Sequence, residues 1–270
     1  MLDFDNIEDW ALKLTAVLRP HVPNSVEQTL LDAELEYIQD AQHILFELTD
    51  RDVIINAIIA WLRSKKIAGY HGSRLTDAEV RSIQLQGLIP LNAKDRRDRL
   101  ISALSSHPGW PEVADLLHPL IRSYGQCNHA GHREGQVHLT LSKAGLMNGF
   151  NHYLTHGSEF DQHIAGDLLG AEGMNLLARY GMPRVFQLAV PGDMALNAAN
   201  RYYSIDDFLE RGEVPNIVSQ FLTAWSCRLA VPDFQSDTMR VDCGMVFRQI
   251  VPAAWITDIQ TLSTTLPSRL

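Results

Sequence analysis

The spacing of apolar positions predicts a helical first part of the chain. Through residues 25–48 the apolar residues return every three or four positions, which places them on one face of an α-helix. Ser25 and Gln28 stand in capping-box positions at its start. A second helix is predicted from Asp50, and the basic run RSKK closes it near the negative end of the helix dipole. We therefore expect residues 1–66 to form a helical region.

After Ile67 the pattern changes to short β-like runs separated by helices. The segments AGYHGS, GQVHLTLS, RVFQLAV and GMVFRQI are typical of strands. Thr76 and Glu79 predict a capped helix that ends at Gly87, where a left-handed cap would stop it, and AKDRRDRLISAL predicts a charged helix. Because strands and helices mix irregularly, we expect an α+β fold, with residues 67–270 as its strand-containing domain.

Composition and charge narrow the classes of function. A net charge of −9 offers no global basic field to attract a phosphate backbone, which argues against a nucleic-acid binder. Three widely spaced cysteines do not suggest a disulfide framework. The acidic start differs from a secretory signal, and the apolar run VIINAIIAWL is too short to span a bilayer. We expect a cytoplasmic protein without a membrane partner.

Two strands carry candidate chemistry. In YHGS, His71 and Gly72 place an imidazole beside a backbone that a ligand can approach closely, although the segment taken alone favours a turn glycine with a hydrogen-bonded histidine. In VHLTLS, alternation puts His138, Thr140 and Ser142 on one face, opposite an apolar face. That polar row suits a polar ligand, and it also suits a half-exposed strand facing water.

A metal site is the weaker possibility. Cys127, His129, His132 and His138 are zinc-ligand types, but their spacing, C-x-H-x2-H-x5-H, matches no common structural zinc pattern. A polar loop leading into the strand explains them as well, and we expect no metal. A zinc-dependent hydrolase built on the first three of these residues remains an alternative. The sequence contains no GxGxxG, P-loop, GxSxG or HExxH motif.

The order of the motifs carries a resemblance. YHGS, VHLTLS, GMPRVFQLAV and CGMVF followed by IVPAAWI resemble, in that order, the ADP-ribosyltransferase superfamily. The nearer likeness is to the branch of the RNA 2′-phosphotransferases, which carries histidines at both the first and second motifs. The resemblance covers residues 68–260. It implies a split core of two small sheets with NAD in the cleft between them, preceded here by the helical N-terminal region.

The resemblance also implies residue roles. His71 would contact a ribose hydroxyl of NAD, the Gly72 backbone would bond the nicotinamide amide, and His138 would face His71 near the nicotinamide ribose. Val246, or its neighbour Met245, would occupy the hydrophobic third position. Asp242 is the acid nearest the last motif, with Glu213 a remote alternative. The implied catalytic residues are His71, His138 and Asp242, and the implied NAD-binding residues are Tyr70, His71, Gly72, Ser73, Arg74, His138, Thr140, Ser142 and Val246.

The implied activity is NAD-dependent ADP-ribosyl transfer. The enzyme would cleave the nicotinamide glycosidic bond and pass ADP-ribose to a protein, a nucleic acid, a small molecule or water, as toxins, effectors and defence proteins of the superfamily do. Catalysis would consist mostly of positioning and electrostatic stabilisation. The acidic first 66 residues differ from the basic module that holds a 2′-phosphate, although Arg74 and Arg133 stand beside the histidine motifs. A catalytically inactive binding module of the same fold is the alternative.

Overall fold

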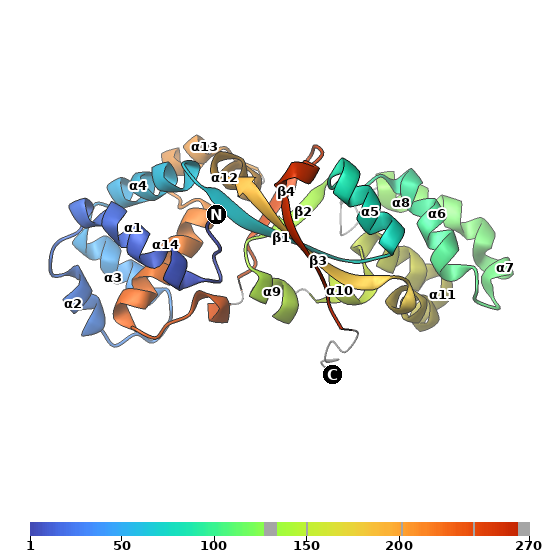
Figure 1. Cartoon of the computed structure of the whole chain (residues 1–270), viewed down its shortest axis with the longest axis horizontal. Helices are drawn as coiled ribbons and strands as arrows, with labels where there is room; N and C mark the ends of the chain where they lie inside the picture. Colours follow the sequence, from blue (N-terminus) through green and yellow to red (C-terminus); the bar gives the residue numbers. More distant parts are fainter. Residues whose placement is uncertain (127–133, 150, 201, 240, 264–270) are drawn as a thin grey trace. The chain divides into compact units, whose positions relative to one another are not determined.

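A computed structural model describes residues 1–126, 134–149, 151–200, 202–239 and 241–263 (Figure 1). The strands it contains are β1 (Lys66–Leu75), β2 (Val137–Thr140), β3 (Met182–Pro191), β4 (Gly244–Phe247) and β5 (Ile256–Thr261). Among the described residues they form one five-stranded antiparallel sheet in the order β4-β2-β1-β3-β5, with Tyr70 opposite Thr140. Helices and this sheet together confirm the α+β class.

The chain divides into two compact units. Unit 1 contains Met1–Tyr70, Leu139–Gly149 and Leu188–Met245, and unit 2 contains His71–His138, Phe150–Gln187 and Val246–Leu270. In this division the N-terminal residues group with two later segments of the chain. Each strand from β1 to β4 begins in one unit and ends in the other.

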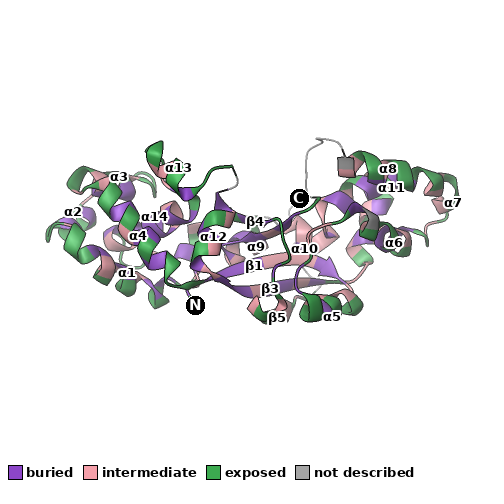
Figure 2. Ribbon diagram, turned by 90° about the horizontal axis from the view of Figure 1, so that it is seen from above, coloured by how far each residue is buried: buried purple, intermediate pink, exposed green. Residues whose placement is uncertain are grey.

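Unit 1 is built around α14 (Asn216–Ala230), a helix buried along most of its length (Figure 2). The ring of Phe221 lies in edge contact with the rings of Phe4, Trp10 and Trp61, at centroid distances of 5.4, 4.8 and 5.9 Å. Such aromatic contacts dominate the apolar area that a core buries. The other α-helices described in unit 1 are α1 (Ala11–Leu18), α2 (Val26–Leu31), α3 (Asp40–Leu48), α4 (Arg51–Arg63), α9 (Lys143–Asn148), α12 (Gly192–Ala199) and α13 (Ile205–Glu210).

The expected helix over residues 25–48 is two helices, α2 and α3, and this part of the prediction is wrong. Ser25 makes no side-chain cap, and the Asp40 carboxylate instead accepts from the backbone N–H groups of Glu36 and Tyr37. That local hydrogen bonding competes with a continuous helix. The next helix follows the prediction, since the Asp50 side chain caps α4 by accepting from two backbone N–H groups in its first turn.

Unit 2 packs its apolar core between α6 (Ala93–Leu104), α8 (Leu117–Gln126) and α11 (Glu159–Arg179). The predicted capping box of Thr76 and Glu79 is present at the start of α5 (Asp77–Gln86). Gly87 ends α5 at φ +85°, and a side chain there would meet the Val251 carbonyl oxygen, so only glycine fits. The remaining α-helices described are α7 (Trp110–Val113) and α10 (His152–His156). Of the helices in the described ranges, none combines the length and apolar character needed to cross a bilayer.

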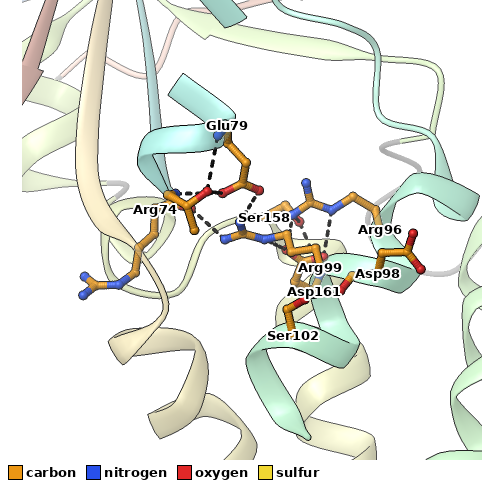
Figure 3. Close-up of polar contacts among 9 residues, drawn as sticks. Arg74, Glu79, Arg96, Asp98, Arg99, Ser102, Ser158 and Asp161 are labelled. Atoms are coloured by element: carbon orange, nitrogen blue, oxygen red, sulfur yellow. Dashed lines mark hydrogen bonds and ion pairs between the residues drawn. The ribbon is translucent and has the colours of Figure 1, made fainter. Parts of the chain in front are cut away.

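A buried ion cluster joins these elements of unit 2 (Figure 3). The fully buried carboxylate of Asp161, in α11, accepts from Arg96 Nε at 2.9 Å and Arg99 Nε at 3.0 Å, both arginines lying in α6. Arg99 also pairs with the Glu79 carboxylate and donates to the Arg74 carbonyl oxygen at 2.7 Å. One carboxylate therefore fixes α6 against α11, while Arg99 extends the cluster to α5 and to the end of β1.

Asp161→Asn should strongly destabilise the protein, by about 3–5 kcal/mol, because it leaves two largely buried arginines short of negative charge. Burial alone would raise the pKa of Asp161, but Arg96 and Arg99 outweigh it and hold this pKa below its ordinary 3.8. The contribution to stability is thus complete above about pH 4 and falls as acid protonates the folded carboxylate.

Urea unfolding at pH 7 and at pH 3 measures both effects. The matched control is Asp98→Asn, which removes an exposed carboxylate of α6. The control should change the free energy of unfolding by no more than about 0.5 kcal/mol. Equal stabilities of the two variants at pH 7 would contradict the role given to Asp161.

Candidate functional site

The structure brings His71 and His138 together on neighbouring strands of unit 2. His71 lies in β1 and His138 in β2, and His71 Nδ1 is 2.9 Å from the backbone carbonyl oxygen of His138. The contact therefore runs from the ring of one histidine to the backbone of the other. The His71 ring also lies 6.2 Å, centroid to centroid, from the buried ring of Phe186 in β3.

These surroundings fix the protonation of His71. Burial lowers the pKa of the half-buried imidazole, although the hydrogen bond to the His138 carbonyl opposes this effect. A carbonyl oxygen can only accept, so the proton of the neutral ring sits on Nδ1. Nε2 then carries a lone pair. Among the described residues Nε2 has no hydrogen-bond partner, so it remains available as an acceptor.

The His138 imidazole makes a contact of its own. Its Nε2 lies 2.9 Å from the Oε1 of Gln136, a buried side chain two residues earlier in the chain. The backbone carbonyl of Gln136 accepts from the Leu91 N–H at 3.1 Å. The segment after α5 thus holds the start of β2 in place, and with it the carbonyl oxygen that orients His71.

Three expected NAD-binding residues belong to unit 1 and are buried. The Tyr70 hydroxyl donates to Asp3 Oδ2 at 2.8 Å, and Ser142 caps α9 by accepting from the Gly145 N–H at 2.9 Å. Thr140 Oγ1 is enclosed without a hydrogen-bond partner among the described residues. The expected polar row of β2 is therefore covered at this end, where Ser142 performs a structural task.

The other expected residues fall in both units. Gly72, Ser73 and Val246 are half-buried residues of unit 2, whereas Met245 is fully buried in unit 1. Asp242 is exposed in unit 1, just before β4, and Glu213 is also exposed in unit 1. Arg133 lies outside the described residues. The candidate site built below therefore uses residues of unit 2 alone.

Arg74 is the most unusual expected site residue. It lies near the end of β1 with an exposed fraction of only 5%. Its guanidinium Nε is enclosed and has no hydrogen-bond partner among the described residues. Burial, and secondarily the charge of Arg99, lower the pKa of Arg74. Figure 3 shows its side chain turned away from the ion cluster, although its carbonyl oxygen belongs to that cluster.

Sequence reasoning missed the groups that surround Arg74. His156, the last residue of α10, is half-buried, and its pKa is lowered by burial, by His152 and by the charge of Arg74. Arg99 and Asp161 set the position of the Arg74 backbone. The segment HGSEFDQH contains His156 and Asp161, but no local pattern reveals that they meet the end of β1 in space.

Metal-ligand types do not cluster in the described part of the chain. No three His, Cys, Asp or Glu side chains among those residues are grouped as a metal ion would require. Cys127, His129 and His132, on which the zinc alternative rests, lie outside the described residues. Burial raises the pKa of Cys227 to about 11 and that of Cys243 to about 12, which keeps both thiols protonated at neutral pH.

Comparison of the chain with family models, with curated proteins and with solved structures finds no match.

The geometry predicts that His71 is neutral at pH 7, with its proton on Nδ1. Its pKa should lie below 6.5, so the folded protein takes up this proton less readily than the unfolded chain, and stability should fall as the pH drops below about 6.5. A pH titration of the ¹⁵N-labelled histidines by NMR tests both points, with the missing signal of His71→Asn giving the assignment. A His71 pKa at or above 6.5, or a proton on Nε2, would contradict this prediction.

Proposed function

We propose that the protein is an NAD-dependent ADP-ribosyltransferase-like enzyme that cleaves the nicotinamide glycosidic bond and transfers ADP-ribose to an acceptor. The observation that carries the proposal is the hydrogen bond from His71 Nδ1 to the His138 carbonyl oxygen, at 2.9 Å. Because it commits the only proton of the neutral ring, Nε2 is left as an acceptor without a partner among the described residues. A hydroxyl group of a ribose is the partner that such an acceptor suits.

The order of the strands supports the same proposal. The first, second and last motifs lie on β1, β2 and β4, which are consecutive neighbours in the sheet. The residues of these motifs are far apart in the sequence. His71 and His138, for example, are separated by 67 positions. Adjacent strands are what a shared binding site for these motifs requires.

In the proposed reaction, NAD supplies an activated ribose from which nicotinamide leaves. His71 would hold a ribose hydroxyl through Nε2, and its own orientation is set by the His138 carbonyl and the Phe186 ring. The half-buried Gly72 backbone is the neighbouring group for a carboxamide. Asp242 keeps the catalytic role that the resemblance implies for it, and as an exposed residue of unit 1 it is not part of the geometry described here for unit 2. Positioning of this kind is a major source of rate enhancement.

Purified protein incubated with NAD should therefore release nicotinamide, measured by liquid chromatography. His71→Asn should lower the rate roughly a hundredfold or more, the effect of losing one positioned hydrogen-bonding group. Its amide can still donate to the His138 carbonyl from near the Nδ1 position, but it offers nothing at the position of Nε2. His71→Gln, whose amide reaches the Nε2 position, should retain more activity than His71→Asn.

The matched control is His43→Asn, which changes an exposed histidine of α3. It should leave the rate unchanged, and circular dichroism should show that every variant is folded. Absence of nicotinamide release from the unmodified protein would refute the enzymatic proposal, and NAD binding without release would favour the inactive binding module. A rate that His71→Asn does not change would remove His71 from the mechanism.

A further inference from the structure

Unit 2 exposes apolar side chains at the end of α5. Leu85, on the last turn of this helix, has an exposed fraction of 82%, and Ile89 and Ile250 have exposed fractions of 50% and 52%. An antiparallel bridge between Leu88 and Val251 joins the two isoleucine segments, with N–H···O distances of 2.9 Å in both directions. The bridged pair is buried, so the next residues, Ile89 and Ile250, lie opposite each other on the solvent side. We call Leu85, Ile89 and Ile250 the apolar patch.

An open groove begins beside the apolar patch. It measures about 500 Å³ and runs from Gln84, the neighbour of Leu85 in α5, along η5 (Ala253–Trp255) and the edge strand β5. Figure 2 shows that α5 is exposed along most of its length. A hollow next to exposed aliphatic side chains can receive a bulky side chain of a partner. The residues that line it are Gln84, Ala253, Ile256, Thr257, Asp258 and Ile259.

Two arginines flank the apolar patch. Arg81 lies one helical turn before Leu85 on α5, and Arg248 lies two positions before Ile250. Both arginines are exposed, and neither forms a hydrogen bond or an ion pair with a residue in the described part of the chain. The patch therefore combines aliphatic side chains with two cations that have no partner there.

The acids of the same elements are already engaged. Asp77 and Glu79, the acids of α5, form ion pairs with arginines of β3 and α6. Asp258, in the groove, accepts from the side chain of Gln260 at 2.8 Å. The charges of the two flanking arginines are therefore left for a partner, which should bring carboxylates together with apolar side chains.

Unit 1 exposes a segment with this chemistry between α2 and α3. Residues 31–40, here called the acidic segment, contain acidic residues and no lysine or arginine. Tyr37 has an exposed fraction of 62%, and Ile38, Glu34 and Glu36 are exposed as well. Among the described residues, no hydrogen bond or ion pair engages the carboxylates of Glu34 and Glu36 or the hydroxyl of Tyr37. Two free carboxylates thus stand beside an exposed aromatic ring.

The acidic segment has a fixed conformation. The Asp40 carboxylate accepts from the backbone N–H groups of Glu36 and Tyr37 at 3.0 and 2.8 Å. The Ile38 carbonyl oxygen accepts from Cys227 Sγ at 2.9 Å. A segment that is ordered before binding loses less conformational entropy when it binds. Tyr37 is therefore presented as a preformed anchor, and tyrosine is enriched among the side chains that dominate interface energies.

We propose that the acidic segment of one copy docks on the apolar patch of a second copy of this chain. Tyr37 would enter the groove beside Leu85, with the two free carboxylates next to the two free arginines. A second copy is the occupant because the chain itself carries, in one ordered segment, the aromatic, aliphatic and acidic side chains that the patch calls for. The two surfaces differ, so the copies associate head to tail. The proposal does not depend on cleavage of NAD.

Sedimentation velocity of the full-length protein over about a hundredfold range of concentration tests the association, which should be weak for an interface of this size. The average mass should rise with concentration. Raising NaCl from about 0.05 to about 0.5 M should weaken the association severalfold, because salt screens exposed charges. Arg81→Gln should reduce this dependence on salt, since it removes one of the two cations.

Leu85→Glu and Tyr37→Glu should each weaken the association by about tenfold or more, the effect of losing an interface anchor. Leu12→Glu is the matched control, because Leu12 of α1 has an exposed fraction of 80% and the substitution adds the same charge. It should associate like the unmodified protein. Circular dichroism should show that all three variants are folded, as expected for changes at exposed positions.

A mixture of the two weakened variants tests whether unlike surfaces meet. Leu85→Glu retains the acidic segment, and Tyr37→Glu retains the apolar patch. Together they should form a complex of one copy of each that does not grow further. If the patch bound the same patch of another copy, Tyr37→Glu would associate normally and mixing would restore nothing, which would overturn the proposal.

Three further results would overturn it. One is a mass that stays that of a single chain at every concentration. Another is an equal loss of association in Leu12→Glu and Leu85→Glu. The third is sedimentation with vesicles of phosphatidylserine and phosphatidylcholine in the absence of self-association, since arginines around an apolar patch also suit an anionic membrane surface. Nicotinamide release is not measured in these experiments, so failure of the NAD reaction and failure of the docking remain distinguishable.

Discussion

The arrangement of unit 2 depends on the charge balance around the buried carboxylate of Asp161. A carboxylate without solvent is stable only when cations and donors surround it, and Arg96 and Arg99 supply both. Arg99 can do so because its remaining nitrogens bond Glu79 and the Arg74 carbonyl. Each of these groups forms a hydrogen bond or an ion pair with another. Removing one therefore leaves a charge or a donor without a partner in the low dielectric of the interior.

The same constraint explains the state of Arg74. Its carbonyl is held by Arg99 at 2.7 Å, so the backbone at the end of β1 cannot move the side chain toward a carboxylate without breaking the cluster. The negative charges of the cluster are already matched by two arginines. A third cation beside a neutral cluster gains nothing from it.

Local signals in the sequence predicted those helices whose ends are fixed by contacts between residues close together in the chain. The capping box of Thr76 and Glu79, the cap of Asp50 and the bounds of α6 all follow from residues a few positions apart. The break between α2 and α3 was missed because the Asp40 carboxylate binds backbone N–H groups earlier in the chain, and helical periodicity does not reveal such a contact. The edge strand β5 was missed because ITDIQT is polar and largely exposed.

The sequence predicted that the two candidate histidines lie on neighbouring strands, and it did not predict the electrostatics around them. YHGS and VHLTLS singled out His71, Arg74 and His138, and the structure places both histidines on neighbouring strands. The protonation of His71 depends on a carbonyl oxygen 67 positions away. The lack of a carboxylate partner for Arg74 depends on two arginines that already pair with Asp161. These arginines, Arg99 and Arg96, lie 62 and 65 positions from Asp161 in the sequence. No spacing rule covers such distances, because they are set by the packing of the helices.

His71 and Arg74 differ in how they respond to burial. Burial makes His71 neutral, so it presents an acceptor, whereas Arg74 cannot lose its proton and presents a cation. The two residues are three positions apart on one strand, a separation on the order of 10 Å. Side chains an odd number of positions apart on a strand point to opposite faces of the sheet, so His71 and Arg74 present an acceptor and a cation on different faces of β1.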